Sequence, residues 1–369
     1  MTLKTLVIGV LKEPENEPRV SITPEIVASY TKANVKILIE KGAGDRSFIR
    51  DEEYESKGAQ VLSRAEVLSQ SNVLLVINRP ELNSLPTDLS PKIWVGVYQA
   101  RFATEVISEW SDAGHTLFSM DALPRTTRAQ SMDVLSSQAN IAGYKAVLLA
   151  ATEYPRYFPM FMTAAGSVPP AKVLILGAGV AGLQAIATAR RLGAVVEVFD
   201  TRPAVKEEVN SLGAKFVEVE GAADASRSGG YAVEQDEAFQ KLQRDKIAQH
   251  AAKSDVIITT AQIPGRPAPI LITKEMINSM RSGAVIIDLA SSTGGNTELT
   301  QDQQTVTAGG VRIIGNSALF GLAAADASRL YAKNIYNFLS LMLDSEGNFN
   351  LNLEDDLVKG CYFGNLITQ

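Results

Sequence analysis

The sequence predicts an α/β protein of two doubly wound domains with a cleft between them, and three observations support this fold class. The chain has 369 residues, 46% hydrophobic and 21% charged, which suits two separate hydrophobic cores and excludes extensive disorder. Short apolar runs alternate with helical patterns along both halves, as in parallel sheets covered by helices. The second half also carries glycines in G-x-G-x-x-G spacing between a strand and a helix, which is the Rossmann arrangement.

The first domain is expected to span residues 1–135 and to be completed by 325–369. A helix is predicted at Pro24–Asn34, with Thr23 as its N-cap and Pro24 in its first turn. Further helices are expected at Arg64–Ser69 and Ala103–Ala113. Strands are expected at Thr5–Leu11, Val35–Glu40, Ala59–Leu62, Val73–Asn78, Ile93–Gln99 and Thr116–Met120. The first strand-to-helix loop lacks the glycine pattern, so this domain is Rossmann-like without an obvious dinucleotide of its own.

The second domain is expected at residues 136–324. Ser136–Ala151 has helical spacing, and the aromatic and proline-rich Glu153–Met162 after it favours a long connecting helix over a flexible linker. A helix from about Leu319 to Leu343 would carry the chain back to the first domain. Six strands, the full doubly wound set, are expected near Val173, Val195, Lys215, Asp255, Ala284 and Val311.

The glycine stretch predicts a dinucleotide site. Gly177 suits the tight turn, Gly179 has no Cβ to block a pyrophosphate, and Gly182 allows close packing of helix on strand. Asp200 ends the next strand, where its carboxylate would bond the ribose hydroxyls and repel a 2′-phosphate. Arg202 is a residue type that receives a 2′-phosphate, but Asp200 precedes it at the strand tip, so we expect NAD(H) rather than NADP(H).

Two loops are candidates for function. The insertion between Val219 and Asp255 is long for this fold, and we expect a mobile lid near 220–233 that carries Tyr231, followed by an amphipathic helix at Glu234–Lys253; the alternative is a disordered surface loop with an incidental tyrosine. The loop Pro124–Gln138 follows the last strand of the first domain. It offers donors and acceptors without a nucleophile and base pair, and the alternative is a helix-capping loop with solvated charges. These side chains are Arg125, Arg128, Gln130, Asp133 and Ser136.

Composition excludes several classes of protein. The net charge of −6 gives no basic surface for nucleic acid or an anionic membrane. Cys361 is the single cysteine, so we expect no disulfide framework, no thiolate metal cluster, and a reducing compartment. The first residues are too weakly apolar for an export signal, and no stretch suits a membrane span. We therefore expect a soluble, cytoplasmic chain that reaches a membrane only through a partner.

Several segments resemble the soluble NAD(H)-binding alpha subunit of proton-translocating NAD(P) transhydrogenase. RAQSMD (Arg128–Asp133) and GGYA (Gly229–Ala232) are the specific pieces, since the others are also similar to alanine dehydrogenase. The matching segments are Leu11–Glu25, Pro124–Val147, Leu176–Pro203, Ser228–Ala232 and Thr259–Asn334.

The resemblance implies direct hydride transfer between NADH here and NADP+ on a partner subunit, coupled to proton translocation by a transmembrane subunit. It implies a homodimer, cytoplasmic and peripheral to the inner membrane through its partners. The implied catalytic residues are Arg125, Gln130, Asp133 and Ser136. The implied cofactor-binding residues are Gly177, Ala178, Gly179, Val180, Gly182, Asp200, Thr201, Arg202, Gly230, Tyr231, Thr260 and Ala261. No metal site is expected.

Two alternatives remain open: an alanine dehydrogenase-like amino-acid dehydrogenase and a non-catalytic NAD-binding protein. Oxidative deamination needs a general acid or base and a cation for the carboxylate. Where alanine dehydrogenases carry lysine, histidine and aspartate, this chain has Asn78, Gln99 and Ser292, although Arg19 is retained. Hydride transfer between two nicotinamides exchanges no proton at the carbon centres, so it needs positioning rather than an acid or base.

Overall fold

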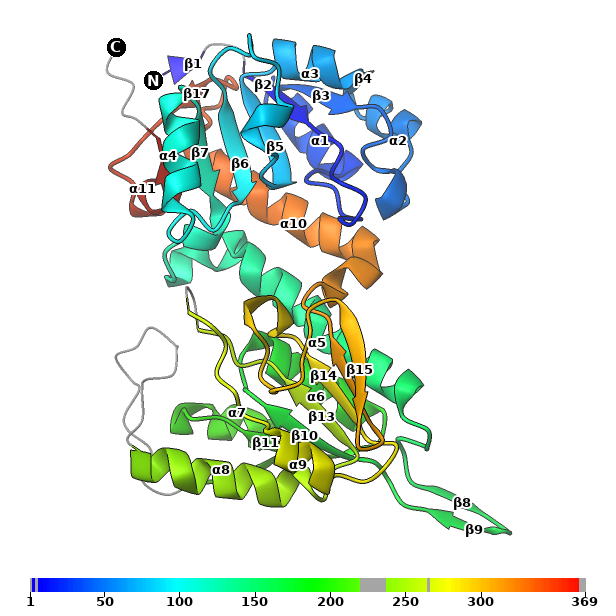
Figure 1. Ribbon diagram of the computed structural model, residues 1–369. Helices are drawn as coiled ribbons and strands as arrows, with labels where there is room; N and C mark the ends of the chain where they lie inside the picture. The colour runs from blue at the N-terminus through cyan, green and yellow to red at the C-terminus, as the bar shows by residue number, and fades with distance from the viewer. Residues whose placement is uncertain (1, 4–5, 220–236, 264–265, 365–369) are drawn as a thin grey trace. The chain divides into compact units, whose positions relative to one another are not determined.

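The computed structural model describes residues 2–3, 6–219, 237–263 and 266–364 (Figure 1). The chain divides into two compact units. The first consists of Met1–Gln138 and Ala323–Gln369, and the second is Ala139–Leu322. The first unit is therefore built from two separate stretches of chain, while the second is continuous.

The first unit contains a seven-stranded sheet in the order β18-β7-β6-β5-β2-β3-β4. The strands are parallel except β18, which pairs antiparallel with β7. The six parallel strands therefore have the doubly wound order, in which the first strand of the set lies at the centre. The elements are β1 (Thr2–Leu3), β2 (Val7–Val10), α1 (Pro24–Lys32), β3 (Lys36–Glu40), α2 (Asp51–Glu55), β4 (Gln60–Leu62), α3 (Arg64–Gln70), β5 (Val73–Asn78), β6 (Ile93–Val97), α4 (Thr104–Asp112), β7 (Thr116–Ser119), the 3-10 helix η4 (Thr127–Met132), α10 (Ala324–Leu339), β17 (Phe349–Asn350), α11 (Asp356–Cys361) and β18 (Tyr362–Phe363).

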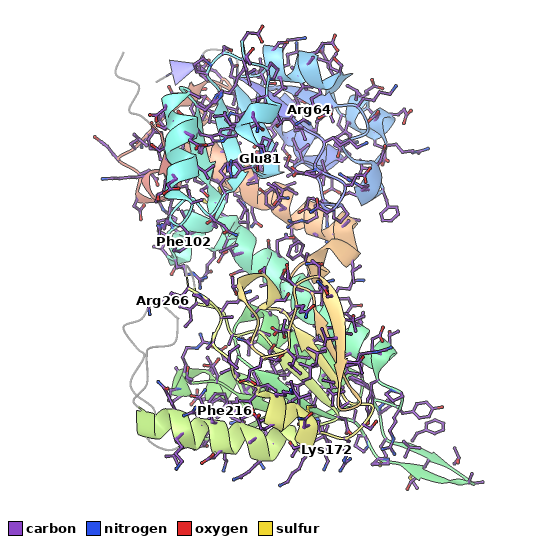
Figure 2. All side chains as sticks on the ribbon, viewed as in Figure 1. Arg64, Glu81, Phe102, Lys172, Phe216 and Arg266 are labelled. Atoms are coloured by element: carbon purple, nitrogen blue, oxygen red, sulfur yellow. The ribbon has the colours of Figure 1, made fainter. Side chains whose placement is uncertain are left out.

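The second unit contains another seven-stranded sheet, in the order β12-β11-β10-β13-β14-β16-β15. Its strands are parallel except the edge strand β15, so it repeats the doubly wound order. Figure 2 marks Lys172 at the start of β10 and Phe216 in β12. The elements are α5 (Val134–Glu153, which begins in the first unit), β8 (Phe161–Thr163), β9 (Gly166–Val168), β10 (Lys172–Leu176), α6 (Val180–Arg191), β11 (Val195–Phe199), α7 (Lys206–Ser211), β12 (Lys215–Phe216), α8 (Glu237–Ala251), β13 (Val256–Thr259), α9 (Lys274–Ser279), β14 (Val285–Asp288), β15 (Gln304–Ala308), β16 (Val311–Gly315) and the 3-10 helix η7 (Leu319–Ala323).

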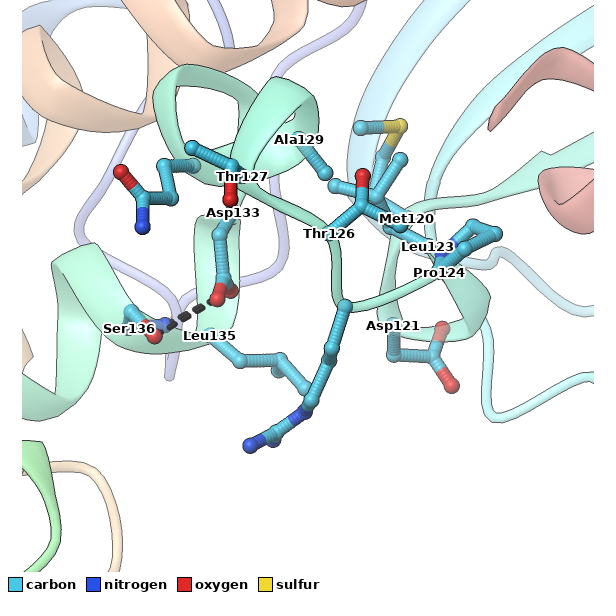
Figure 3. Close-up of a pocket in the computed structure, with 12 residues that line it drawn as sticks. Met120, Asp121, Leu123, Pro124, Thr126, Thr127, Ala129, Asp133, Leu135 and Ser136 are labelled. Atoms are coloured by element: carbon cyan, nitrogen blue, oxygen red, sulfur yellow. Dashed lines mark hydrogen bonds between the residues drawn. The ribbon is translucent and has the colours of Figure 1, made fainter. Parts of the chain in front are cut away.

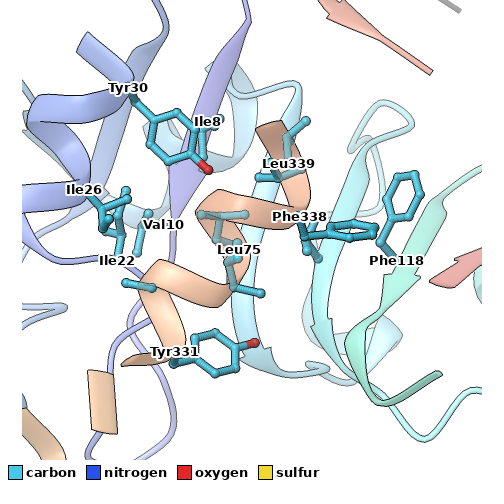
Figure 4. Close-up of a cluster of buried hydrophobic side chains, with 14 of the residues drawn as sticks. Ile8, Val10, Ile22, Ile26, Tyr30, Leu75, Phe118, Tyr331, Phe338 and Leu339 are labelled. Carbon is cyan, nitrogen blue, oxygen red and sulfur yellow. The ribbon is translucent and has the colours of Figure 1, made fainter. Parts of the chain in front are cut away.

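Each sheet is buried on both faces, as its almost unbroken apolar strands require. In β10, Val173 and Ile175 pack with residues of α5 and α6, whereas Leu174 and Leu176 pack with residues of α8 and α9. In the first unit α10 covers one face of the sheet (Figure 4), and the rings of Phe338 and Phe118 have centroids 5.6 Å apart. The α/β class predicted from the alternating pattern is confirmed.

The structure corrects several local expectations. The connecting helix ends at Glu153, and the aromatic segment leads into the hairpin β8–β9, which the pattern missed. Thr23 occupies the N-cap position of α1, but its buried hydroxyl makes no capping hydrogen bond. The short helix α2 and the antiparallel edge strands β15 and β18 were also not predicted. The proposed lid near 220–233 lies outside the described residues.

Among the described residues, no helix is both long enough and apolar enough to cross a membrane.

Candidate functional site

The glycine turn of the second unit has the geometry that a dinucleotide site requires. Gly177 has φ +105°, a left-handed conformation that favours glycine. A Cβ on Gly182 would lie 1.9 Å from the carbonyl oxygen of Gly177, whereas a Cβ on Gly179 would meet nothing within 4 Å. Gly179 is the N-cap of α6, so the unpaired first-turn N–H groups begin at this open space and can receive a pyrophosphate.

Asp200 lies directly after β11, where a ribose-binding acid is expected. Its side chain is only 6% exposed, and it forms an ion pair with Arg202, which is 20% exposed. Oδ1 accepts hydrogen bonds from the backbone N–H and the Nε of Arg202, at 2.8 and 2.9 Å. Oδ2 accepts from Ala178 N–H at 2.7 Å and Arg202 Nη2 at 2.8 Å. The hydrogen bond to Asp200 raises the pKa of Arg202.

The turn after β13 is held by internal hydrogen bonds. The Thr260 hydroxyl donates to the Gly177 carbonyl at 3.1 Å, and so links this turn to the glycine turn. The Asn296 side chain accepts from Ala261 N–H at 3.0 Å and donates to the Ala261 carbonyl at 2.8 Å. Asn296 is itself held by buried Asp288, which accepts its backbone N–H at 2.7 Å. Thr260 and Ala261 thus lie beside the glycine turn with most of their polar groups already paired.

A cavity of about 370 Å³ lies in the first unit, along the loop that follows β7 (Figure 3). Arg125, Gln130, Asp133 and Ser136 all line it, so the four residues expected in the hydride-transfer site lie around one space. Asp121 also lines it and was missed from the sequence. The available signal was its place at the carboxyl end of β7, the position from which parallel strands present ligand-binding groups.

The cavity loop is rigidly anchored. Asp133 accepts hydrogen bonds from the backbone N–H and the hydroxyl of Ser136, at 2.9 and 2.6 Å, and so caps the start of α5. The guanidinium of Arg128 points elsewhere, because it pairs with Asp355 at 2.6 Å and with neighbouring Asp356. From α10, Asn334 and Asn337 each donate to the Ser131 carbonyl at 2.9 Å. Part of the alternative prediction, a helix-capping loop, is therefore correct for Asp133 and Ser136.

Arg19 lies in a buried polar cluster of the first unit. Its guanidinium donates to both carboxylate oxygens of Glu17, at 2.8 and 2.6 Å, and to Gln138 Oε1 at 2.9 Å. Burial pushes the pKa of Glu17 upward, but hydrogen bonds and charge from Arg19 hold it below its usual value. Asn78 donates to the same carboxylate at 3.1 Å. Nearby Glu13 is desolvated, which raises its pKa to about 7 although two backbone N–H groups bond it.

The two histidines lie in structural settings. His115 is 4% exposed, contacts the rings of Trp94 and Trp110, and accepts a hydrogen bond from Lys92 N–H at 3.1 Å. Burial lowers its pKa. His250 on α8 pairs with Glu197 at 2.6 Å. The predicted cofactor residues Gly230 and Tyr231 lie outside the described residues.

The chain is similar to known proteins over nearly its whole length. Residues 9–142 match "Alanine dehydrogenase/PNT, N-terminal domain", and residues 146–365 match the corresponding C-terminal domain. The first of the polypeptides that make up NAD(P) transhydrogenase subunit alpha in Rhodospirillum rubrum is 45% identical, covering 93% of this chain and 92% of that protein. A crystal structure of transhydrogenase from Sinorhizobium meliloti is 46% identical, with a TM-score of 0.87 over 97% of this chain and 98% of that one. Alanine dehydrogenase of Methanococcus maripaludis is 29% identical, covering 79% of this chain and 74% of that protein.

Proposed function

The chain belongs to the alanine dehydrogenase/PNT family, and from this premise we propose that it is the NAD(H)-binding component of a proton-translocating transhydrogenase. Hydride would pass directly between NADH held here and NADP+ held by a partner subunit. The observation that carries the proposal is the cavity along the loop after β7, because Arg125, Gln130, Asp133 and Ser136 of the PRTTRAQSMDVLSSQ segment line one space. The 45% identity to a transhydrogenase alpha subunit supports it.

The second unit fits NAD(H). Gly179 opens onto free space at the N-terminus of α6, Gly182 allows the close helix packing, and Asp200 stands where a ribose-binding acid is needed. These residues would hold the pyrophosphate and the adenosine ribose. The nicotinamide supplies the hydride, which leaves the chain's own residues the tasks of binding, orienting and excluding water.

The cavity loop is suited to positioning. Two nicotinamide carbons must approach to about 3–3.5 Å for transfer, so small errors of placement are costly. Arg125 and Gln130 would bond the carboxamide of NADH and meet the incoming NADP(H). Asp133 and Ser136 would keep the start of α5 in register with them through their mutual hydrogen bonds.

Amino-acid dehydrogenation is the competing function, and the buried cluster argues against it. Arg19, the cation available for a substrate carboxylate, already binds the internal carboxylate of Glu17 through two hydrogen bonds. Asn78, which replaces the lysine of alanine dehydrogenases, donates to that same carboxylate. A substrate carboxylate would therefore have to displace Glu17 from both groups. A non-catalytic NAD-binding protein would share every feature of the glycine turn, so only turnover separates it.

Partners complete the proposed enzyme. The fingerprint of this chain provides for one nucleotide, so an NADP(H)-binding subunit would bring the other, and a transmembrane subunit would couple transfer to proton translocation and bring the chain to the membrane. We also expect a homodimer. The hairpin β8–β9 supports this, since Met160 and Met162 are 62% and 73% exposed and the rings of Tyr157 and Phe161 stack 5.2 Å apart beside them. Exposed apolar patches of this kind mark association surfaces.

The test is a mixed assay of the chain with an isolated NADP(H)-binding domain of a transhydrogenase. Transfer between NADH and an oxidised NADP analogue should require both proteins. Reductive amination of pyruvate by the chain alone, with ammonia and NADH, would establish alanine dehydrogenase activity instead. NADH binding without turnover in either assay would favour the non-catalytic alternative.

A further inference from the structure

We infer that Arg202 competes with the adenosine ribose for Asp200, and that its guanidinium must leave this carboxylate before NAD(H) can bind there. The inference rests on the proposed function, because it concerns the same nucleotide site. It assigns Arg202 the role of a specificity-determining residue, which differs from that of a phosphate receptor.

The acceptor positions of Asp200 are filled within the chain itself. An ionised carboxylate has about four such positions. At Asp200, two are filled by the backbone N–H groups of Ala178 and Arg202, at 2.7 and 2.8 Å, and two by Arg202 Nε and Nη2, at 2.9 and 2.8 Å. A ribose diol that donates two hydrogen bonds needs two positions. The guanidinium occupies that number.

The side chain is the part that can move. The two backbone donors belong to the turns after β10 and β11, and their loss would require those turns to change shape. The guanidinium is at the end of a flexible side chain that is 20% exposed, so rotation toward solvent releases it without a change of backbone. The paired carboxylate is 6% exposed, so the guanidinium also shields it from water in the nucleotide-free chain.

Removing the guanidinium should have opposite effects on the two nucleotides. Apparent affinity falls in proportion to the fraction of molecules that are ready to bind. If the ion pair is closed in about nine molecules of ten, its removal should strengthen NADH binding by about tenfold. The carboxylate of Asp200 would then lack its neutralising partner and would repel a 2′-phosphate more strongly, so NADPH binding should weaken. Arg202 therefore limits the selectivity that Asp200 alone would provide.

The experiment is calorimetric titration of wild type, Arg202→Ala and Arg202→Lys with NADH, NADPH and ADP-ribose. We expect Arg202→Ala to bind NADH and ADP-ribose about tenfold more tightly and NADPH more weakly. Lysine keeps the charge but lacks the two-donor fork, so Arg202→Lys should show a smaller gain in NADH affinity. The control is Arg312→Ala, which removes the ion pair between Arg312 and Glu153 in the same unit and should leave all three affinities unchanged.

The outcomes separate the two proposals. Unchanged or weaker NADH binding in both folded Arg202 variants would overturn this inference and leave the proposed function standing. A wild-type chain that binds neither NADH nor ADP-ribose would overturn the proposed function and this inference with it. A gain for NADH and NADPH alike would also count against the competition, because it would reflect a general loosening of the site.

Discussion

Replacing Gly182 by alanine should damage both the stability of the second unit and its nucleotide site. The added Cβ would lie 1.9 Å from the Gly177 carbonyl oxygen and 2.9 Å from its carbon. Heavy atoms in contact are normally about 3.5 Å apart, so the glycine turn or the start of α6 must shift by more than about 1 Å. Overpacking costs about 1–3 kcal/mol, and a rigid backbone neighbour favours the upper end. Alanine's better helix propensity offsets about 1 kcal/mol.

We therefore expect Gly182→Ala to lower the free energy of unfolding by about 2 kcal/mol and to weaken NADH binding at least tenfold, or about 1.4 kcal/mol. Gly179→Ala is the matched control, because its Cβ would meet nothing within 4 Å and its φ of −78° suits alanine. That variant should lose less than about 1 kcal/mol of stability yet still bind NADH poorly, since its methyl occupies the pyrophosphate space. Urea unfolding of the nucleotide-free proteins and calorimetry with NADH measure the two effects. Wild-type stability in Gly182→Ala would refute the packing argument.

Three further predictions address other parts of the molecule. Gln130→Asn should lower the transfer rate with saturating partner by about tenfold, or about 1.4 kcal/mol in barrier, with less change in NADH affinity; wild-type transfer would remove this side chain from the mechanism. Asn296→Ala would take away the side chain that bonds both the N–H and the carbonyl of Ala261, so urea unfolding should show a loss of about 1–3 kcal/mol, and an unchanged unfolding free energy would contradict this role. Because the pKa of Glu13 is raised to about 7 in the folded chain, its contribution to stability is present below its unfolded pKa and is lost as pH rises from about 4.5 to 7, by roughly 3 kcal/mol at most. Unfolding curves of wild type and Glu13→Gln should therefore differ in their pH dependence across that window, and parallel pH profiles would show that Glu13 does not titrate there.

The sequence predicted the elements whose signals are local. The strand, glycine turn and helix around Gly177 follow from apolar periodicity and glycine spacing, and the acid at Asp200 follows from its distance along the chain. The edge strands β15 and β18 were missed because an antiparallel partner is chosen by packing between distant segments, for which a two-residue strand such as Tyr362–Phe363 carries no pattern. The hairpin β8–β9 was missed because its exposed apolar residues do not alternate with polar ones.

The candidate site divides in the same way. Membership of the cavity loop could be predicted, since Arg125 to Ser136 are close in sequence and follow one strand. The partners of its charges could not, because they come from other elements. Arg128 pairs with Asp355, which is 227 positions away, and Arg19 bonds Gln138, which is 119 positions away. Arg202 was considered as a receptor for a 2′-phosphate, and only the folded structure shows that its guanidinium bonds the neighbouring acid.

The discontinuous first unit has a consequence for the order in which the protein is made. Its hydrophobic core includes Tyr331, Ile335, Phe338 and Leu339 of α10, which the ribosome adds only after the whole second unit has been synthesised. The second unit can fold while it emerges, because its contacts lie within one continuous stretch. The first unit must keep its parallel strands unsatisfied for that time, with the sheet face that α10 later covers still open. Its N-terminal segment is therefore the region of the nascent chain most exposed to aggregation and most dependent on chaperones.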